Sequence, residues 1–381
     1  MPNKTASSVV TPPSTTEIWS YTANTDDLSS NFTSLLDKDL ATKGSWRQDY
    51  EFYCSQFNII PCPFIKSSIE SDSESCRVAN CIVDLSSWRA MLLACCTVGS
   101  KVCEISVHAS QLSVHHLTDL SKAIEKSGLI RVLKLQYLSI EVTAENSIAY
   151  SNAIRPLFND TMNLEYISIK GNNFGDEFVQ PLVASLCKNF RLKFLNLSGN
   201  VLSDVTVLEL FSALRLTTNL TDICLADNNL SGDCLNKLLA PILLGNEIAT
   251  ADDEAIVKAN TKYVTDRNKN IKETNKKRKK AGYLEWNELA LSGECIVKKD
   301  GKLQVFNRSF KSFDFSRNTI QTEQLLLFVR DLKAASDISV SSSKMAMVFK
   351  GLPNKLPPDA LAEMVSFNSP WVELVLDSNM N

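Results

Sequence analysis

The stretch LKFLNLSGNVL, residues 192–202, decides the fold that the sequence predicts. It follows the pattern L-x-x-L-x-L-x-x-N-x-L, in which Asn200 stands where the alternation of apolar and polar residues ends. The same pattern returns 28 residues later in LTDICLADNNL, residues 220–230, and 28 residues earlier in LEYISIKGNNF, residues 164–174. Three consecutive copies at one period indicate a repeat architecture.

Further copies extend the repeat in both directions along the chain. Three more are clear and two are degenerate, namely VCEISVHASQL (102–112), IRVLKLQYLSI (130–140), FKSFDFSRNTI (310–320), MAMVFKGL (345–352) and WVELVLDSN (371–379). Between the copies the spacing of apolar residues changes from two to the helical 3.6, as at Val207, Leu210 and Leu214. Each unit is therefore predicted to be a strand, a turn and a helix.

These motifs resemble the leucine-rich repeat family, in the 28-residue form found in ribonuclease inhibitor. The resemblance implies an α/β fold, a leucine-rich repeat solenoid or horseshoe with parallel strands on the concave face and helices on the convex face. One unit cannot bury its own apolar face, so neighbouring units must stack into a continuous core. In that family the repeated asparagine is buried and bonds backbone groups of adjacent turns. The matching residues here are Asn172, Asn200, Asn228, Asn318 and Asn379. Ser110 and Leu138 replace the asparagine in the first two turns, where this ladder is expected to weaken.

The repeat also sets the expected division of the chain. From Leu225 to Phe315 is 90 residues where one period would give 28, so an insertion interrupts the repeats. The expected segments are a largely disordered tail (1–48), a capping region (49–101), a first block of repeats (102–243), a charged insertion (244–308) and a second block with degenerate last turns (309–381). The insertion is expected to hold a helix that frays near residues 275–282 and then short strands around Asp300 and Gly301.

Charge is unevenly distributed along the chain. The formal net charge is −3, but residues 258–280 carry ten Lys and Arg against Asp266 and Glu273. The candidate basic patch is Lys276, Lys277, Arg278, Lys279 and Lys280. A solvated tail is the favoured interpretation of such a run, and a contact with an acidic surface such as tubulin is the alternative. Because aromatic residues are not interleaved with these charges, nucleic acid is not an expected partner.

The strands predict a second candidate surface. Residues that alternate with the buried pair of each strand point to the concave face. The candidate protein-binding residues on it are Glu104, Val132, Tyr166, Phe194, Asn196, Asp222 and Asp314. Tyr166 and Phe194 fall on neighbouring strands, and two adjacent aromatic residues with no core to fill indicate an interface anchor. Cover by the N-terminal tail or the insertion is the competing interpretation.

Residues for catalysis are not evident. The sequence has no phosphate-binding loop, no G-x-S-x-G and no H-E-x-x-H, so no enzyme activity, cofactor or small-molecule substrate is expected. His108 is expected at a concave position, and His115 and His116 in a turn. Cys54, Cys62, Cys76 and Cys81 lack a common zinc spacing, so no metal is expected, and the cysteines are expected to stay reduced. No secretory leader or membrane span is recognised, which favours the cytoplasm.

The order of the parts resembles one family within the repeat proteins more closely. An irregular first repeat, KVCEISVHASQL, a long charged insertion, and resumption at DGKLQVFNRSFKSFDFSRNTI are similar to the family of leucine-rich repeat-containing protein seventy-one, which is associated with cilia and flagella. This resemblance implies a non-enzymatic scaffold of the axoneme, with axonemal proteins or tubulin as partners. Two alternatives stay open, a regulator of a small GTPase similar to the GTPase-activating proteins for Ran, and a cytosolic inhibitor similar to ribonuclease inhibitor.

Overall fold

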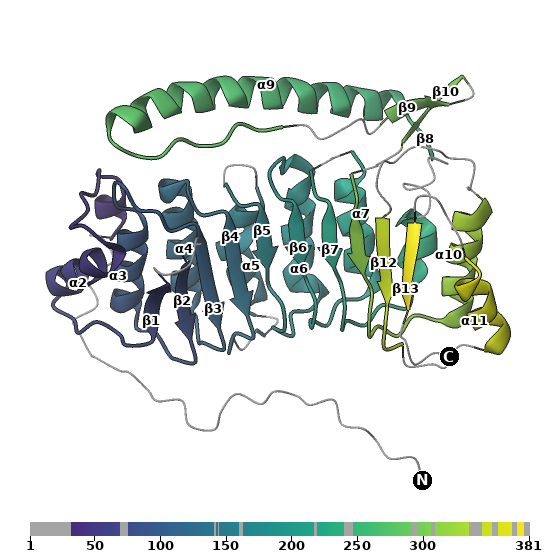
Figure 1. Cartoon of the computed structure of the whole chain (residues 1–381), viewed down its shortest axis with the longest axis horizontal. Coiled ribbons are helices and arrows are strands. Elements are labelled where there is room, and N and C mark those ends of the chain that lie inside the picture. The colour runs from purple at the N-terminus through teal and green to yellow at the C-terminus, as the bar shows by residue number, and fades with distance from the viewer. Residues whose placement is uncertain are drawn as a thin grey trace, which may run out of the picture.

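The computed structural model describes residues 32–68, 75–140, 142–143, 145–159, 163–216, 219–239, 247–290, 296–299, 301–305, 309–334, 345–352, 357–367 and 372–376. Over these ranges the chain is an α/β protein built on one large sheet (Figure 1). Helices line one face of the sheet, and the strands form the other face, which we call the open face (Figure 1). The α/β class expected from the repeats is confirmed.

The sheet has ten strands, and their order in space follows their order in the chain. They are β1 (Ile65–Ser68), β2 (Ser75–Ala79), β3 (Glu104–His108), β4 (Val132–Gln136), β5 (Tyr166–Ser168), β6 (Phe194–Asn196), β7 (Asp222–Cys224), β11 (Ser312–Asp314), β12 (Met345–Phe349) and β13 (Val372–Leu376). β1 and β2 are antiparallel, and every other neighbouring pair is parallel. Leu195 pairs with Ile223, and Ile223 pairs with Phe313 across the insertion, as the repeat predicts.

Helices lie between successive strands and return the chain to the start of the next strand, except that the first of them precedes β1. They are α2 (Trp46–Gln56), α3 (Leu85–Cys95), α4 (Val114–Ser127), α5 (Ser147–Ile154), α6 (Asp176–Ala184), α7 (Asp204–Leu214), α10 (Thr322–Ala334) and α11 (Pro358–Val365). Short turns of tighter or wider helix follow at Arg155–Phe158, Ser185–Lys188 and Leu235–Leu239. Side chains of Asp84 and Ser203 cap the starts of α3 and α7, because each accepts a backbone N–H of the first turn.

One apolar cluster fills the space between the sheet and its helices. It is continuous from Phe32 at one end of the molecule to Val372 at the other. Leu195 and Phe313 are fully buried in it. No single strand–helix unit encloses such a cluster, so each unit depends on its neighbours for burial of its apolar face.

Asparagines repeat along the turns that follow the strands. The Asn200 amide donates to the carbonyls of Ile169, Leu197 and Ser198, and its Oδ1 accepts the N–H of Phe174. Asn172, Asn228 and Asn318 bond their neighbouring turns in the same manner. Ser110 is also buried, but its hydroxyl contacts only Cys81, through the N–H and the thiol, and the His108 carbonyl. The side chain of Leu138 cannot form a hydrogen bond. The ladder therefore weakens in the first two turns, as expected, whereas Asn379 lies outside the described residues.

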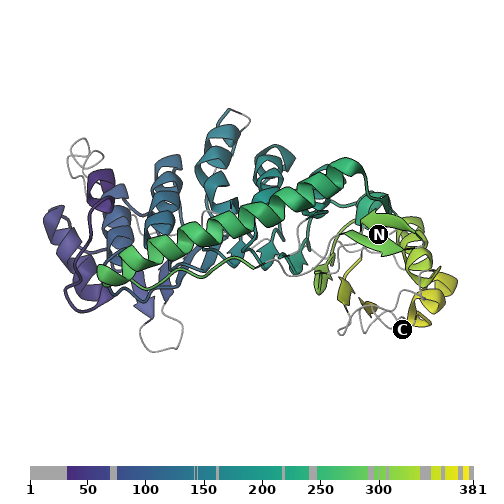
Figure 2. The same cartoon turned by 90° about the horizontal axis from the view of Figure 1, so that it is seen from above.

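The insertion forms a long arm, which we call the brace, along the side of the sheet at which the parallel strands begin. Its main element is α9 (Ala251–Lys280), which runs over the loops that lead into the strands and reaches the end of the molecule that holds α2 and α3 (Figures 1 and 2). The strands β8 (Glu247–Ile248), β9 (Ile296–Lys299) and β10 (Lys302–Val305) make a small antiparallel sheet at its other end. The expected short strands are thus present.

Apolar contacts attach the middle of α9 to the repeats. Val264 and Ile271 of the helix form a small buried cluster with Phe190, from the loop before β6, and Leu289, from the returning chain. Asn268 and Asn275 hold the returning chain beside the helix through both backbone groups of Leu289 and Trp286. The predicted fraying near residues 275–282 is wrong, because α9 continues to Lys280, and Asn275 and Arg278 in this part bond neighbouring segments.

The capping region begins earlier in the sequence than predicted. Residues 32–36 are helical, and the side chains of Phe32, Leu36 and Leu40 are buried in the main cluster. The Leu40 N–H also donates to the hydroxyl of Tyr283. Residues 32–48 therefore belong to the capping region, and the part of the expected disordered tail from residue 1 to residue 31 lies outside the described residues.

Candidate protein-binding surface

The open face carries two rows of side chains across the strands. One row is Glu104, Val132, Tyr166, Phe194, Asp222 and Ser312, each paired in register with the next. The second row is Ser106, Lys134, Ser168, Asn196, Cys224 and Asp314. The structure thus brings together, on one face, all seven residues that the strand pattern selects as candidates.

The two aromatic residues stack in the middle of this face. The ring centroids of Tyr166 and Phe194 are 4.4 Å apart and their planes differ by 4°. Both side chains are half-buried, and the Lys134 ammonium lies 5.7 Å from the centre of the Tyr166 ring. Burial raises the pKa of the Tyr166 hydroxyl above its ordinary value, with smaller contributions from Cys224 and Glu104. The pair is therefore a preformed, partly apolar platform that stays neutral at physiological pH.

The two sides of the platform differ in charge. On the side of β3 and β4, Lys134 donates to the Glu104 carboxylate at 2.8 Å, so these charges balance. On the side of β7 and β11 lie the carboxylates of Asp222 and Asp314, both half-buried. Burial raises the pKa of the Cys224 thiol to about 11, and the nearby Asp314 and Asp222 add to this shift. This end of the open face therefore has a negative field.

Asn196 has a local structural role besides its place in the second row. Its Oδ1 accepts the backbone N–H of Ser198 at 2.9 Å, and the Asp314 carboxylate accepts the N–H of Ser316 in the same way at 3.0 Å. Such a bond requires an acceptor but not a charge. The side-chain oxygen of Asn196 is thus occupied by a hydrogen bond within its own turn.

The basic patch divides into one structural residue and four exposed ones. Arg278 donates to the carbonyls of Ser127 and Leu284, and its guanidinium lies 5.0 Å from the ring centres of both Tyr283 and Trp286. It fastens the end of the brace to the loop after α4. The other four, Lys276, Lys277, Lys279 and Lys280, are exposed on α9. The solvated tail expected here is thus wrong for Arg278, and the patch is part of an ordered helix.

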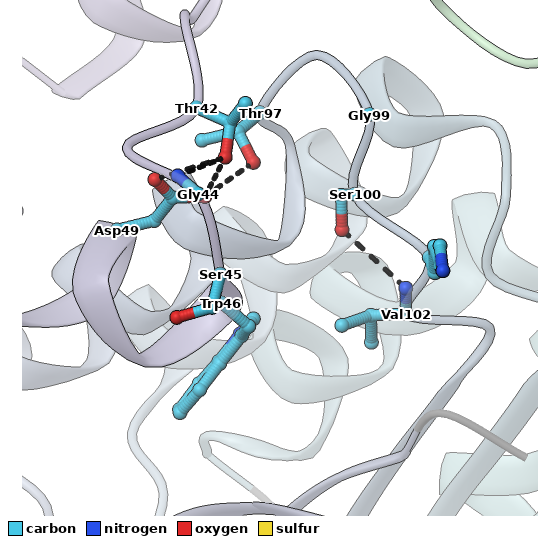
Figure 3. Close-up of a pocket in the computed structure, with 10 residues that line it drawn as sticks. Thr42, Gly44, Ser45, Trp46, Asp49, Thr97, Gly99, Ser100 and Val102 are labelled. Atoms are coloured by element: carbon cyan, nitrogen blue, oxygen red, sulfur yellow. Dashed lines mark hydrogen bonds between the residues drawn. The ribbon is translucent and has the colours of Figure 1, made fainter. Parts of the chain in front are cut away.

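A small cavity lies in the capping region, between the loop before α2 and the loop after α3 (Figure 3). Its volume is about 180 Å³, and Asp49, Thr97 and Lys101 are among its lining residues. The buried Asp49 carboxylate accepts hydrogen bonds from the hydroxyls of Thr42 and Thr97 (Figure 3). It also accepts the Lys43 N–H. These contacts join the two loops, so the carboxylate serves the packing of the cap.

The described cysteines and histidines sit mostly in structural positions. Cysteines at seven positions are buried free thiols, whereas Cys187 is exposed. Within the ranges that the structure describes, no three His, Cys, Asp or Glu side chains are placed to share a metal ion. His108 is exposed on β3, its ring 5.3 Å from that of Tyr137. His115 and His116 belong to the first turn of α4, so the prediction that they lie in a turn before the helix is wrong.

His116 predicts a pH dependence of stability. Burial lowers the pKa of its imidazole to about 4, although the Val83 carbonyl opposes the shift. Because the folded-state pKa lies below the unfolded value, the unfolded chain binds more protons between these values. Stability should therefore be complete above about pH 6.5 and fall as the pH drops towards 4, by up to about 3 kcal/mol. Urea unfolding of wild type and His116→Gln at pH 7 and pH 4.5 tests this, and the variant should lose less stability between the two.

Comparison with known proteins gives no family for this chain. No model of a protein family matches the sequence, and no curated protein matches it either. Among the helices that the structure describes, none is both long and apolar enough to span a bilayer.

Proposed function

We propose that this chain is a leucine-rich repeat solenoid that acts as a non-enzymatic scaffold and binds another protein on its open, concave face. The stacked Tyr166–Phe194 pair carries the proposal. The cilium or flagellum, with the axoneme as the assembled structure, is the cellular setting that the resemblance in the order of parts favours.

The repeat geometry supports the first part of this proposal. Strands at 28-residue intervals pair in chain order, helices line one face only, and buried asparagines join successive turns. Each of these features is what stacking of identical units requires, since a unit buries its apolar surface and satisfies its buried polar groups through its neighbours. The brace lies beyond the ends at which the strands begin and does not run across the open face of β5 and β6 (Figure 1).

The aromatic pair supports the second part. Both residues occupy strand positions that face away from the core, so they add nothing to the inter-unit cluster. Aromatic side chains that are held rigidly lose little conformational freedom on binding, which is why they dominate protein interfaces. In contrast, the four exposed lysines of α9 are long side chains in solvent, and ion pairs that they form are weak and screened by salt.

A comparison of two variants tests the proposal. Tyr166→Ala with Phe194→Ala should lower capture of partner proteins from an extract of flagellated cells at least tenfold, because the platform is removed. Lys276, Lys277, Lys279 and Lys280 changed to Gln should retain most of the capture, with Arg278 left intact so that the brace stays attached. Arg77→Ala, exposed on the same face in β2 and three strands from Tyr166, is the matched control for the open face. Equal urea midpoints would show that all variants fold.

Two outcomes would contradict it. Full retention of partners by the aromatic variant would exclude the open face as the docking site. Loss of partners only in the lysine variant, with steep sensitivity to salt, would assign binding to the brace. A tagged copy that is missing from the axonemal fraction of flagellated cells would remove the ciliary setting and leave the scaffold proposal in place.

A further inference from the structure

Two carboxylates beside the aromatic platform have no cationic partner in the parts of the chain that the structure describes. Asp222 pairs in register with Phe194 on the next strand, about 4.8 Å away along the sheet. Asp314 lies one strand further and one row along, beside Cys224. Neither carboxylate has a Lys or Arg within ion-pair distance among these residues, whereas Glu104, on the other side of the platform, has Lys134 at 2.8 Å.

Each carboxylate also keeps one oxygen without a described donor. Asp222 accepts the Thr221 hydroxyl at 2.6 Å through Oδ2, and Asp314 accepts the Ser316 N–H at 3.0 Å through Oδ1. Both side chains are only half-exposed, so their charges are less well hydrated than those of a free surface aspartate. A cation that docks here would meet two negative charges on adjacent strands next to an apolar ring.

The turn geometry does not explain the charges. Asn196 makes the same bond to its turn as Asp314 with a neutral amide, so the bond needs an acceptor alone. Among the described residues, Asp222 has no hydrogen bond to its turn and accepts one only from the neighbouring Thr221 hydroxyl. The negative field that these groups create reaches Cys224, where it adds to the effect of burial on the thiol.

We infer that the open face binds a protein segment bearing an arginine next to an apolar residue, the guanidinium packing against the Phe194 ring and pairing with Asp222 and Asp314. The inference rests on the proposed function and names the chemistry of the partner. A planar guanidinium can lie on an aromatic ring and present its N–H groups in a fork to carboxylates, whereas a lysine ammonium is a strongly hydrated point charge. The apolar neighbour of the arginine would cover the rest of the Tyr166–Phe194 platform.

Selection from a random library of 12-residue peptides on phage tests the inference with the full chain immobilised. The selected peptides are synthesised with a fluorescent label and titrated against wild type and against the charge-neutral variant Asp222→Asn with Asp314→Asn. Asparagine keeps the acceptor for Ser316, as Asn196 shows, so the variant should fold normally. Arginine should be enriched beside an apolar residue, and the charge-neutral variant should bind at least tenfold more weakly. Replacing that arginine by citrulline, which keeps the shape and removes the charge, should weaken binding by a similar factor. A lysine at the same position should restore only part of the affinity.

The outcomes separate this inference from the proposed function. Selected peptides that lack a cationic residue, or that bind the charge-neutral variant as tightly as wild type, would overturn the inference. If such peptides still lose binding to Tyr166→Ala with Phe194→Ala, the open face remains the docking site. Peptides that bind Tyr166→Ala with Phe194→Ala as tightly as wild type would overturn both the inference and the proposed function. So would a selection in which no peptide is enriched on wild type relative to that variant.

Discussion

Replacement of Asn318 by leucine is expected to lower the free energy of unfolding by about 3–5 kcal/mol. The Asn318 side chain is fully buried and bonds five backbone groups, one of them the Ser316 carbonyl in its own turn. Three of the five belong to the unit that precedes the insertion. Its amide donates to the carbonyls of Leu225 and Phe315, and its Oδ1 accepts the N–H groups of Asn228 and Leu230. Leucine has nearly the same volume but satisfies none of these groups, and each buried polar group without a partner costs about 1–3 kcal/mol.

Urea denaturation followed by circular dichroism measures this loss. Asn270→Leu is the control, because Asn270 is exposed on α9 and its replacement should change stability by less than about 0.5 kcal/mol. A loss below about 1 kcal/mol in Asn318→Leu would contradict the role of the asparagine in joining the two blocks across the insertion.

Arg215→Met should also destabilise the protein strongly, by about 3–5 kcal/mol, through release of the start of the brace. The Arg215 guanidinium, after α7, pairs with Glu247 at 2.5 and 3.0 Å and with Asp253 at 2.5 and 2.9 Å. The side chain of Asp253 is 7% exposed, so removal of the arginine leaves a buried carboxylate unpaired. Hydrogen exchange should quicken in the first turns of α9, while exchange in β5 and β6 is unchanged.

The pH dependence gives an independent check of the same contact. The hydrogen bonds from Arg215 are the largest cause that holds the pKa of Asp253 well below its ordinary value of 3.8. Since the folded-state pKa is lowered, the stabilisation is present above about pH 4 and is lost as the pH falls below it. The difference between wild type and Arg215→Met should therefore be full at pH 7 and smaller at pH 2.5. Lys237→Met, which breaks an exposed pair with Asp233, should cost little at either pH.

The strands could be predicted because the repeat can be recognised from single residues at fixed spacing. Leu195, Ile223 and Phe313 hold equivalent places in the repeat and become neighbours in the sheet, although 90 residues separate the last two. The platform followed from the same register, since Tyr166 and Phe194 are 28 residues apart and alternate with buried positions. A local pattern is enough to predict those contacts that each unit makes with the next in the same way.

The brace was harder to predict because its contacts follow no period. α9 has only Val264 and Ile271 as buried apolar residues, seven positions apart, and their partners are Phe190 and Leu289 from distant segments. Arg278 stands in a run of five basic residues, so nothing local distinguishes the one that bonds to Ser127. Whether Asp222 has an ion-pair partner likewise depends on which Lys and Arg side chains lie near it in the folded chain, and the local sequence does not show this.

The left-handed turn positions could not be predicted from the sequence either. Ala109, Tyr137 and Arg317 adopt positive φ angles of 46°, 53° and 56° after their strands, where Gly199 stands in another unit. An alanine or tyrosine gives no indication of such a conformation, which costs about 1–2 kcal/mol relative to the right-handed region. The N–H of each residue bonds a carbonyl of the next turn, and this contact maintains the conformation.

The brace also has a consequence for the order in which the molecule folds. A stack of units with contacts only between neighbours can start to form anywhere and grow in both directions. The bond from Leu40 to Tyr283 joins residues 243 positions apart, and Arg278 reaches back 151 positions to Ser127. Closing loops of this length is slow and gains nothing until both attachment points exist. We therefore expect docking of α9 to be a late step of folding, and its release an early step of unfolding at the end of the stack that holds α2.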